Sequence, residues 1–274
     1  MADPRPIGVF DSGVGGLTVL REIIRRLPGE STIYLGDNGR APYGVRPDDE
    51  VLAFSTESLD ALVERDVKAL VVACNTSTAV GLGAFRRRYN LPVLGVIRPG
   101  AAAAALATRN GRIGVIATPA TIRSHAYFNA ITEENPAAEV YEHATPALVP
   151  MVEAGELTGA VAESTVTDAL APLVGDGATI DTLLLGCTHY PLIRPLIAEL
   201  TGETVAIVDS ATATASALVE LLGVTGLETA DGAGPPTHVQ LTTGDPARFA
   251  DVAGRLFGPE FVSVAAVELG ALAR

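Results

Sequence analysis

The chain has 274 residues, 48% of which are hydrophobic, and carries a formal net charge of −13. This size allows one large domain or two domains of moderate size with a substantial core. The charge argues against general nucleic-acid binding, because that function needs a basic surface. Residues 1–6 contain no apolar segment of the kind found in secretory signals, and the longest apolar runs are too short to span a bilayer. We therefore expect a cytoplasmic protein that contacts neither membrane nor nucleic acid directly.

Strand and helix patterns alternate from residue 7 to residue 97. Short apolar runs predict buried strands, and segments with apolar residues at helical spacing predict the helices between them. The strands are expected at residues 7–10, 32–35, 69–73 and 92–97, and the first two helices at 16–27 and 48–65. The run at 69–73 is apolar throughout, which indicates a strand covered on both faces. This alternation is typical of a parallel sheet with helices on both sides.

A second pattern begins near residue 112 and repeats the first one. Three features recur in order at offsets of 106, 107 and 113 residues: 112–118 resembles 6–12, 140–141 resembles 33–34, and Cys187 matches Cys74. A strand at 205–208 then corresponds to 93–97. A duplicated α/β unit explains these matches, and chance similarity between valine-rich strands is the alternative.

The segment after residue 209 is a tail and not a third copy. It carries a helix at 211–222, a Gly/Pro-rich loop at 231–236, a strand at 238–243, a helix at 246–257 and a strand at 261–267. The simplest assembly returns this tail to the first unit. We therefore expect an α/β protein with two similar flavodoxin-like domains, mostly parallel sheets and the active site in the cleft between them. The predicted domains are residues 1–98 plus 210–274, and residues 99–209.

The chain has two cysteines, and they occupy matching positions. Cys74 follows the apolar run 69–73, and Cys187 follows the apolar run 182–186. Ligands of open α/β sheets bind outside the carboxyl ends of the strands. The polar residues at such ends are Asp11-Ser12, Asn75-Thr76, Thr118 and Thr188-His189. A small buried core residue is the alternative for either cysteine alone, and both are expected to be reduced. Their paired placement predicts two thiols that face one substrate from opposite sides.

The sequence argues against the common cofactors. Lys68 is the single lysine, and six residues of strand separate it from Cys74 by roughly 20 Å, which disfavours a pyridoxal-phosphate Schiff base. The glycine-rich segment 11–18 has Thr18 where a dinucleotide motif needs glycine, although its amides could hold a carboxylate. Cys187 and His189 lack identifiable partners for zinc. The four histidines, His125, His143, His189 and His238, form no pair spaced to bind a metal. All of them except His189 are expected at surfaces or in turns.

A set of motifs along almost the whole chain resembles the glutamate racemases, cofactor-independent members of the aspartate/glutamate racemase superfamily. The motifs are residues 10–17, Asp37-Asn38 with Pro42-Tyr43-Gly44, residues 73–76, residues 185–191 and residues 242–245. Residues 38–41, with Gly39 and Ala41, and Arg98, where glutamate is common in the family, depart from the pattern. The resemblance implies racemization of L-glutamate to D-glutamate without a cofactor. It also implies supply of D-glutamate for peptidoglycan, and hence for cell-wall biogenesis and cell shape, by an enzyme that is often a homodimer.

Racemization requires a base on one face of Cα and an acid on the other. Cys74 and Cys187 are predicted to exchange these roles, with the sulfur atoms roughly 7 Å apart. Both cysteines precede predicted helices, whose N-termini lower the pKa of a thiol. Asp11 is expected to accept or relay a proton near Cys74, and His189 to do so beside Cys187. The resemblance implies Glu153 as a further helper on the Cys187 side, and a helix-surface carboxylate is the alternative.

The resemblance also implies a set of substrate contacts. These are Asp11, Ser12, Tyr43, Gly44, Asn75, Thr76, Thr188 and His189, with Thr118 and Thr121 as plausible additions. Their hydroxyl, amide and backbone N–H groups would grip two carboxylates. Helix capping is the alternative for Thr76 and Thr188.

Two rival functions remain open from the sequence. An aspartate or hydantoin racemase of the same superfamily would use the same chemistry. A regulatory protein, for instance one that restrains DNA gyrase through protein contacts, would not be excluded by the negative charge.

Overall fold

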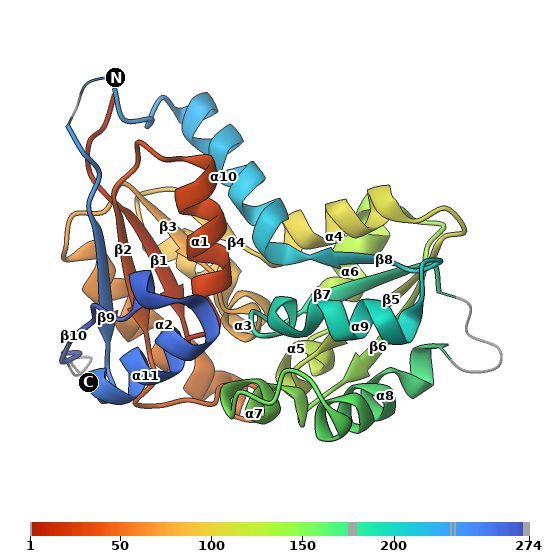
Figure 1. Ribbon diagram of the computed structural model, residues 1–274. Helices are drawn as coiled ribbons and strands as arrows, with labels where there is room; N and C mark the ends of the chain where they lie inside the picture. The colour runs from red at the N-terminus through yellow and green to blue at the C-terminus, as the bar shows by residue number, and fades with distance from the viewer. Residues whose placement is uncertain (1, 175–179, 231, 233, 271–274) are drawn as a thin grey trace.

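The computed structural model describes residues 2–174, 180–230, 232 and 234–270. It consists of two α/β halves that lie side by side, with the first and the last described residues on the first half (Figure 1). The first half contains β1 (Ile7–Asp11), α1 (Leu17–Arg26), β2 (Thr32–Gly36), α2 (Asp48–Val63), β3 (Ala69–Val72), α3 (Asn75–Arg88) and β4 (Val93–Gly95).

The chain then builds the second half and returns as a tail. The second half contains α4 (Ile97–Ala107), β5 (Arg112–Ala117), α5 (Pro119–Arg123), α6 (Ala126–Glu134), β6 (Glu139–Ala144), α7 (Leu148–Glu153), α8 (Ala160–Val174), β7 (Thr182–Gly186), the 3-10 helix η1 (Tyr190–Ile193), α9 (Arg194–Thr201) and β8 (Ala206–Asp209). The tail contains α10 (Ser210–Thr225), β9 (His238–Thr242), α11 (Pro246–Phe257), the 3-10 helix η2 (Pro259–Phe261) and β10 (Ala265–Ala266).

The two sheets repeat one strand order. The first sheet runs β10-β9-β2-β1-β3-β4, and the second runs β6-β5-β7-β8. The strand pairs are parallel, so the fold prediction of two similar α/β units is confirmed. Strands β2-β1-β3-β4 correspond to β6-β5-β7-β8, and the tail strands extend the first sheet beside β2. In both units the switch in strand order lies where ligands bind in such folds.

Residues of the central strands alternate between two apolar clusters because successive side chains of a strand point to opposite faces. Val9 and Val71 belong to the cluster that includes residues of α1, α10 and α11. Phe10 and Val72 belong to the cluster that includes residues of α2 and α3. Both faces of the first sheet are therefore covered, as the continuous apolar run in β3 predicted. Helix α10 packs against α1 and α4 and so joins the two halves.

Lys68 lies directly before β3, at the end of the strand opposite to Cys74. Its side chain is buried and forms an ion pair with Glu30. The ammonium also donates to the carbonyl of Asp3 at 2.7 Å and to Thr229 at 3.1 Å. The single lysine thus has a structural role far from the carboxyl ends of the strands.

Some local expectations differ from the structure. The strand predicted at 261–267 is wrong for most of its length, because the chain forms η2 and then only the two-residue edge strand β10. Phe261 is buried against the core in that turn. His143 lies half-buried in β6, whereas His238 is exposed at the start of β9, at the surface as expected. Residues 231 and 233 of the predicted Gly/Pro-rich loop lie outside the described residues. None of the described helices is long and apolar enough to cross a membrane.

Candidate active site

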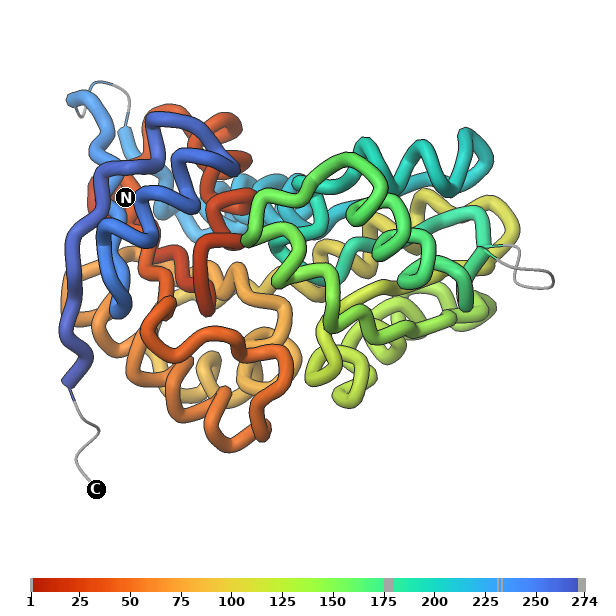
Figure 2. Tube along the Cα trace, turned by 60° about the horizontal axis from the view of Figure 1, so that its bottom comes forward, coloured from red at the N-terminus to blue at the C-terminus, as the bar shows by residue number. Residues whose placement is uncertain are grey.

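A cavity of about 870 Å³ lies where loops from both halves meet. The loops come from the carboxyl ends of the strands, and the two halves face each other along this side (Figure 2). The lining includes most of the predicted site residues: Ser12, Tyr43, Gly44, Cys74, Asn75, Thr76, Thr118, Glu153, Cys187, Thr188 and His189. Asp11 and Thr121 are fully buried and do not line the cavity. The structure thus brings both cysteines and their expected helpers to one place.

Cys74 leaves β3 and begins helix α3. Its thiol donates to Ser12 Oγ at 3.4 Å, and its sulfur accepts from the backbone N–H of Ser77 at 3.4 Å. Burial and the negative charge of Asp11 raise the pKa of the Cys74 thiol to about 11. The backbone N–H of Ser77 at the helix N-terminus lowers this pKa, as expected, but desolvation and the charge of Asp11 outweigh it. A positive charge near this sulfur would favour its thiolate.

Asp11 lies behind the cavity wall and connects the two halves. One carboxylate oxygen accepts from the backbone N–H of Gly13 at 3.0 Å. The other accepts from the hydroxyl of Thr188 at 3.4 Å. Burial raises the pKa of the Asp11 carboxyl, although the nearby His189 opposes this shift. A carboxyl group in this environment can take up a proton more readily than an exposed one.

Cys187 lies beside His189, which in turn contacts Glu153, so two titratable side chains follow the thiol in sequence of contact. Its sulfur lies 3.8 Å from His189 Nδ1, and His189 Nε2 lies 3.1 Å from a carboxylate oxygen of Glu153. Burial lowers the pKa of His189, but its contacts with Cys187 and Glu153 raise it to about 10. The hydrogen bond from His189 lowers the pKa of Glu153. Cys187 precedes a helical segment, as expected, although this segment begins with the 3-10 helix η1 before α9.

The glycine-rich loop after β1 permits the two halves to approach each other. A Cβ atom at Gly15 would lie 2.4 Å from Thr188 Oγ1 and 2.5 Å from His189 Nδ1. At Gly16 a Cβ atom would lie 2.4 Å from the Cβ of Asp11. Thr18 donates from its hydroxyl to the carbonyl of Thr188 at 3.0 Å across the same contact. These glycines are therefore required by close packing.

Asn75 presents an unpaired donor at the cavity. Its side-chain oxygen accepts from the hydroxyl of Tyr127 at 2.6 Å, which fixes the orientation of the amide. The amide nitrogen of Asn75 is buried and has no hydrogen-bond partner within the part of the chain that the structure describes. Because buried donors are almost always paired, this nitrogen is well suited to bind an oxygen of a ligand.

Threonine hydroxyls from both halves form one cluster beside Asn75. Thr76 Oγ1 lies 2.9 Å from Thr118 Oγ1, which lies 3.0 Å from Thr121 Oγ1. Thr118 lines the cavity, whereas Thr121 supports it from behind. The N-terminus of α3 is capped by the sulfur of Cys74, so capping does not account for Thr76.

The loop after β2 forms another part of the wall. The hydroxyl of Tyr43 donates to the carboxylate of Asp37, which also accepts from Arg40 Nε at 2.7 Å. The carbonyl of Gly44 accepts from the backbone N–H of Ala120 in the second half at 2.9 Å. The hydroxyl of Tyr43 is thus already bonded, and this loop spans the junction between the halves.

Helix α11 of the tail supplies cavity residues that the sequence analysis missed. They are Arg248, Asp251, Val252 and Arg255. Their spacing puts them on one helix face. On sequence alone a charged helix face is typical of a solvent-exposed surface, so it gave no indication of a site.

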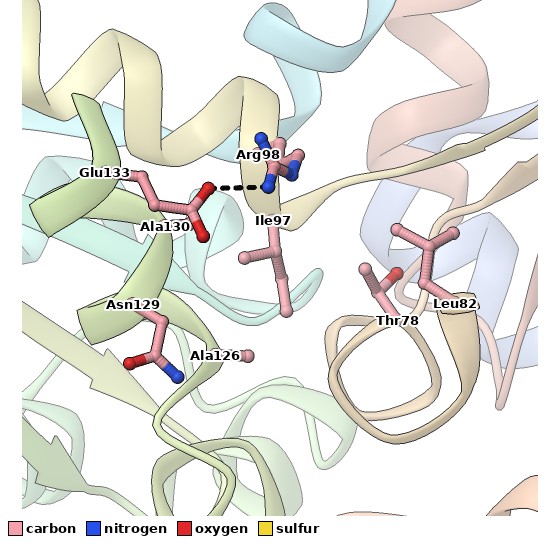
Figure 3. A pocket seen from close by; sticks show the side chains of 8 residues that line it. All are labelled: Thr78, Leu82, Ile97, Arg98, Ala126, Asn129, Ala130 and Glu133. Carbon is pink, nitrogen blue, oxygen red and sulfur yellow. Dashed lines mark hydrogen bonds and ion pairs between the residues drawn. The ribbon is translucent and has the colours of Figure 1, made fainter. Parts of the chain in front are cut away.

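Arg98 lies in a second, smaller cavity of about 150 Å³ between α3, α4 and α6 (Figure 3). Its guanidinium pairs with Glu133 at 2.5 Å. This departure from the family pattern therefore lies away from the cysteines.

Both cysteines are free thiols. No group of three or more His, Cys, Asp and Glu side chains among the described residues could hold a metal ion.

Comparison with known proteins identifies this arrangement. Residues 7–218 match the family model described as Asp/Glu/Hydantoin racemase, and the chain belongs to that family. It is 47% identical to the glutamate racemase of Geobacter metallireducens over 268 residues. The aligned region covers 97% of this chain and 98% of that relative. The enzyme class is therefore amino-acid racemase, an isomerase. The resemblance to glutamate racemases seen in the sequence motifs is confirmed.

Solved structures agree with this assignment. A glutamate racemase isoform of Bacillus anthracis superposes with a TM-score of 0.92 at 45% identity, over 97% of this chain and 98% of that one. A glutamate racemase of Francisella tularensis, solved in complex with D-glutamate, superposes with a TM-score of 0.89 at 34% identity over the same shares.

Proposed function

We propose that this protein racemizes glutamate with Cys74 and Cys187 as the two acid–base groups and without a cofactor. The observation that carries the proposal is the single cavity lined by both thiols, one from each half of a repeated fold. The full-length relatives are glutamate racemases, and the Francisella enzyme binds D-glutamate. We propose the same substrate here.

In the proposed reaction one cysteine is a thiolate and the other a thiol. The thiolate removes the proton from Cα, and the electron pair left on Cα is delocalised into the adjacent carboxylate. The opposite thiol then donates its proton to the other face of Cα and becomes the thiolate. The product is the mirror-image amino acid, and the two cysteines have exchanged protonation states. A separation of the sulfurs of roughly 7 Å remains a prediction, since each must reach the same carbon.

The surrounding groups suit this chemistry differently on the two sides. Burial keeps the pKa of Cys74 at about 11, so we propose that the substrate ammonium favours its thiolate on binding. Asp11 would take up or relay the proton near Cys74. His189, held by Glu153, would do so beside Cys187.

We propose that the substrate carboxylates are held by neutral donors and His189. The unpaired amide nitrogen of Asn75 is one donor, and the hydroxyls of Thr76 and Thr118 lie beside it. The other proposed contacts are Ser12, Tyr43, Gly44, Thr188 and His189. Asp11, expected from the sequence to contact the substrate, lies behind the wall and would act through Thr188. For Tyr43, backbone contact is favoured, because its hydroxyl is bonded to Asp37.

The wider role follows from the family. We propose that the enzyme works in the cytoplasm, that it supplies D-glutamate for peptidoglycan, and that it forms a homodimer. We further propose that its domains comprise residues 1–98 with 210–274 and residues 99–209, since the tail strands extend the first sheet and α10 shares its apolar cluster.

The direct test is racemization of candidate substrates by the purified protein. L- and D-glutamate, L- and D-aspartate and an optically active hydantoin are each followed by circular dichroism without added cofactor. We expect the circular dichroism signal to be lost with both enantiomers of glutamate and to persist with aspartate and the hydantoin. Racemization of aspartate or hydantoin in preference to glutamate would contradict the proposed substrate, and an unchanged signal with every candidate would contradict the enzymatic function.

A further inference from the structure

Helix α11 lies at the junction of the two halves. Leu256 packs against the main apolar cluster of the first half and against the cluster of the second. One face of the helix also lines the cavity, with Arg248, Asp251 and Arg255 among its residues. The tail therefore contributes to the active-site cavity a wall that neither repeated unit supplies.

Arg255 uses all three nitrogens of its guanidinium at this junction. Nε lies 3.3 Å from Asp251 on the same helix. Nη1 donates to the carbonyl of Ala154 at 3.3 Å, and Nη2 donates to the carbonyl of Glu153 at 3.5 Å. These carbonyls lie at the C-terminal end of α7, where unpaired carbonyls and the helix dipole favour a cation. The tail thus donates hydrogen bonds to the end of a helix that belongs to the second half.

The C-terminal end of α7 is connected to the thiol of Cys187. Glu153, whose carbonyl Arg255 binds, reaches back with its carboxylate to His189 Nε2 at 3.1 Å. His189 Nδ1 in turn lies 3.8 Å from the sulfur of Cys187. The hydrogen bonds of Cys74 go instead to Ser12 and Ser77 of the first half. The contact from α11 therefore leads to Cys187 and not to Cys74.

The half-exposed Arg255 side chain lies against the turn that follows α7. Gly155 has a φ of +84°, in the left-handed region, so the chain turns sharply after α7. A Cβ atom at Gly155 would lie 3.0 Å from Arg255 Nη1. A side chain at position 155 would therefore meet the guanidinium that bonds to the end of α7.

We infer that Arg255 is a positioning residue, which fixes the end of α7 so that Glu153 holds His189 against Cys187. This inference rests on the proposed two-thiol function. It assigns to the tail a role in one half of the reaction: proton transfer at Cys187 depends on Arg255, whereas proton transfer at Cys74 does not.

Racemization rates alone cannot separate the two sides. The enantiomers have equal free energies, so kcat/KM must be equal in the two directions for every variant. An irreversible reaction that needs one thiolate avoids this constraint. With threo-3-chloroglutamate, the thiolate removes the Cα proton, the electron pair forms a Cα–Cβ double bond and chloride leaves. The resulting enamine takes up a proton on carbon, and water hydrolyses the imine to 2-oxoglutarate and ammonium.

The experiment measures chloride release from each enantiomer of threo-3-chloroglutamate. Cys74→Ser and Cys187→Ser first establish which enantiomer depends on which thiol. Arg255→Ala is then expected to slow the Cys187-dependent elimination roughly ten- to a hundred-fold, as for small misplacements of a reacting group. The Cys74-dependent elimination is expected to stay unchanged. Arg255→Lys should retain part of the activity, because a lysine keeps the charge but not the forked donors.

The matched control is Arg25→Ala, which removes an exposed arginine that pairs with Glu22 at 2.6 Å on α1. It should leave both eliminations unchanged, and thermal unfolding checks that every variant is folded. Equal slowing of both eliminations in Arg255→Ala, or no slowing, would overturn the positioning role. A wild-type protein that neither racemizes glutamate nor releases chloride would instead overturn the proposed function, and this inference with it.

Discussion

The surroundings of Cys74 and Cys187 differ although the two thiols leave equivalent strands of a repeated fold. Cys74 caps a helix, bonds to a serine hydroxyl and has Asp11 as its charged neighbour. Cys187 lies beside His189, which Glu153 holds from the other side. The repeated sheet therefore determines where the thiols emerge, and the loops determine their chemistry. Such inequality is expected, because one chiral protein must treat two mirror-image substrates.

The largest effect is expected from replacing either thiol. Cys74→Ser and Cys187→Ser should each lower racemization by roughly a thousand-fold or more, since a hydroxyl is a far weaker acid–base group at this site. Steady-state rates with both glutamate enantiomers measure the loss. The fold should persist, as judged by circular dichroism. Near wild-type activity in either variant would remove that cysteine from the mechanism.

A smaller but one-sided effect is expected from the neighbours of Cys187. His189→Gln should slow the Cys187-dependent chloride elimination roughly a hundred-fold. Glu153→Gln should slow the same elimination less, because it acts through His189. If either change slowed only the Cys74-dependent elimination, the assignment of helpers to the two thiols would be wrong.

The close approach of the halves can be tested at Gly15. Gly15→Ala places a methyl group where Thr188 Oγ1 would be 2.4 Å away. Overpacking of this kind costs about 1–3 kcal/mol of stability and should also lower racemization, because it displaces the Cys187 loop. Gly29→Ala is the matched control, since nothing lies within 4 Å of its added Cβ. Equal urea midpoints and rates for the two variants would refute the packing role of Gly15.

The last expected effect concerns stability alone and is a dependence on pH. The pKa of His189 is raised from its ordinary value of 6.5 to about 10 in the folded protein. Its contacts therefore stabilise the fold fully below about pH 6.5, and this contribution is lost as the pH rises through about 10. Urea unfolding of wild type and His189→Gln should differ most at the low end of this range. A difference that grows toward pH 10 would contradict the raised pKa.

Much of the architecture could be predicted from the sequence because it depends on local patterns. Continuous apolar runs predicted the strands around Val9 and Val71. The polar residues that follow those strands predicted the place of the cavity. The environment of the thiols could not be predicted, because it depends on desolvation and on residues distant in the chain. The pKa of Cys74 rises through burial beside Asp11, and α11 reaches Glu153 through Arg255. Neither relation leaves a periodic signal.

The most direct test of the two-thiol account is the racemization of L-glutamate in deuterium oxide, stopped early and analysed on a chiral column. Two thiols on opposite faces predict that the D-glutamate formed carries deuterium at Cα, while the remaining L-glutamate keeps its protium. A single acid–base group would give deuterium in both enantiomers or carry the original proton into the product, and either result would contradict the account.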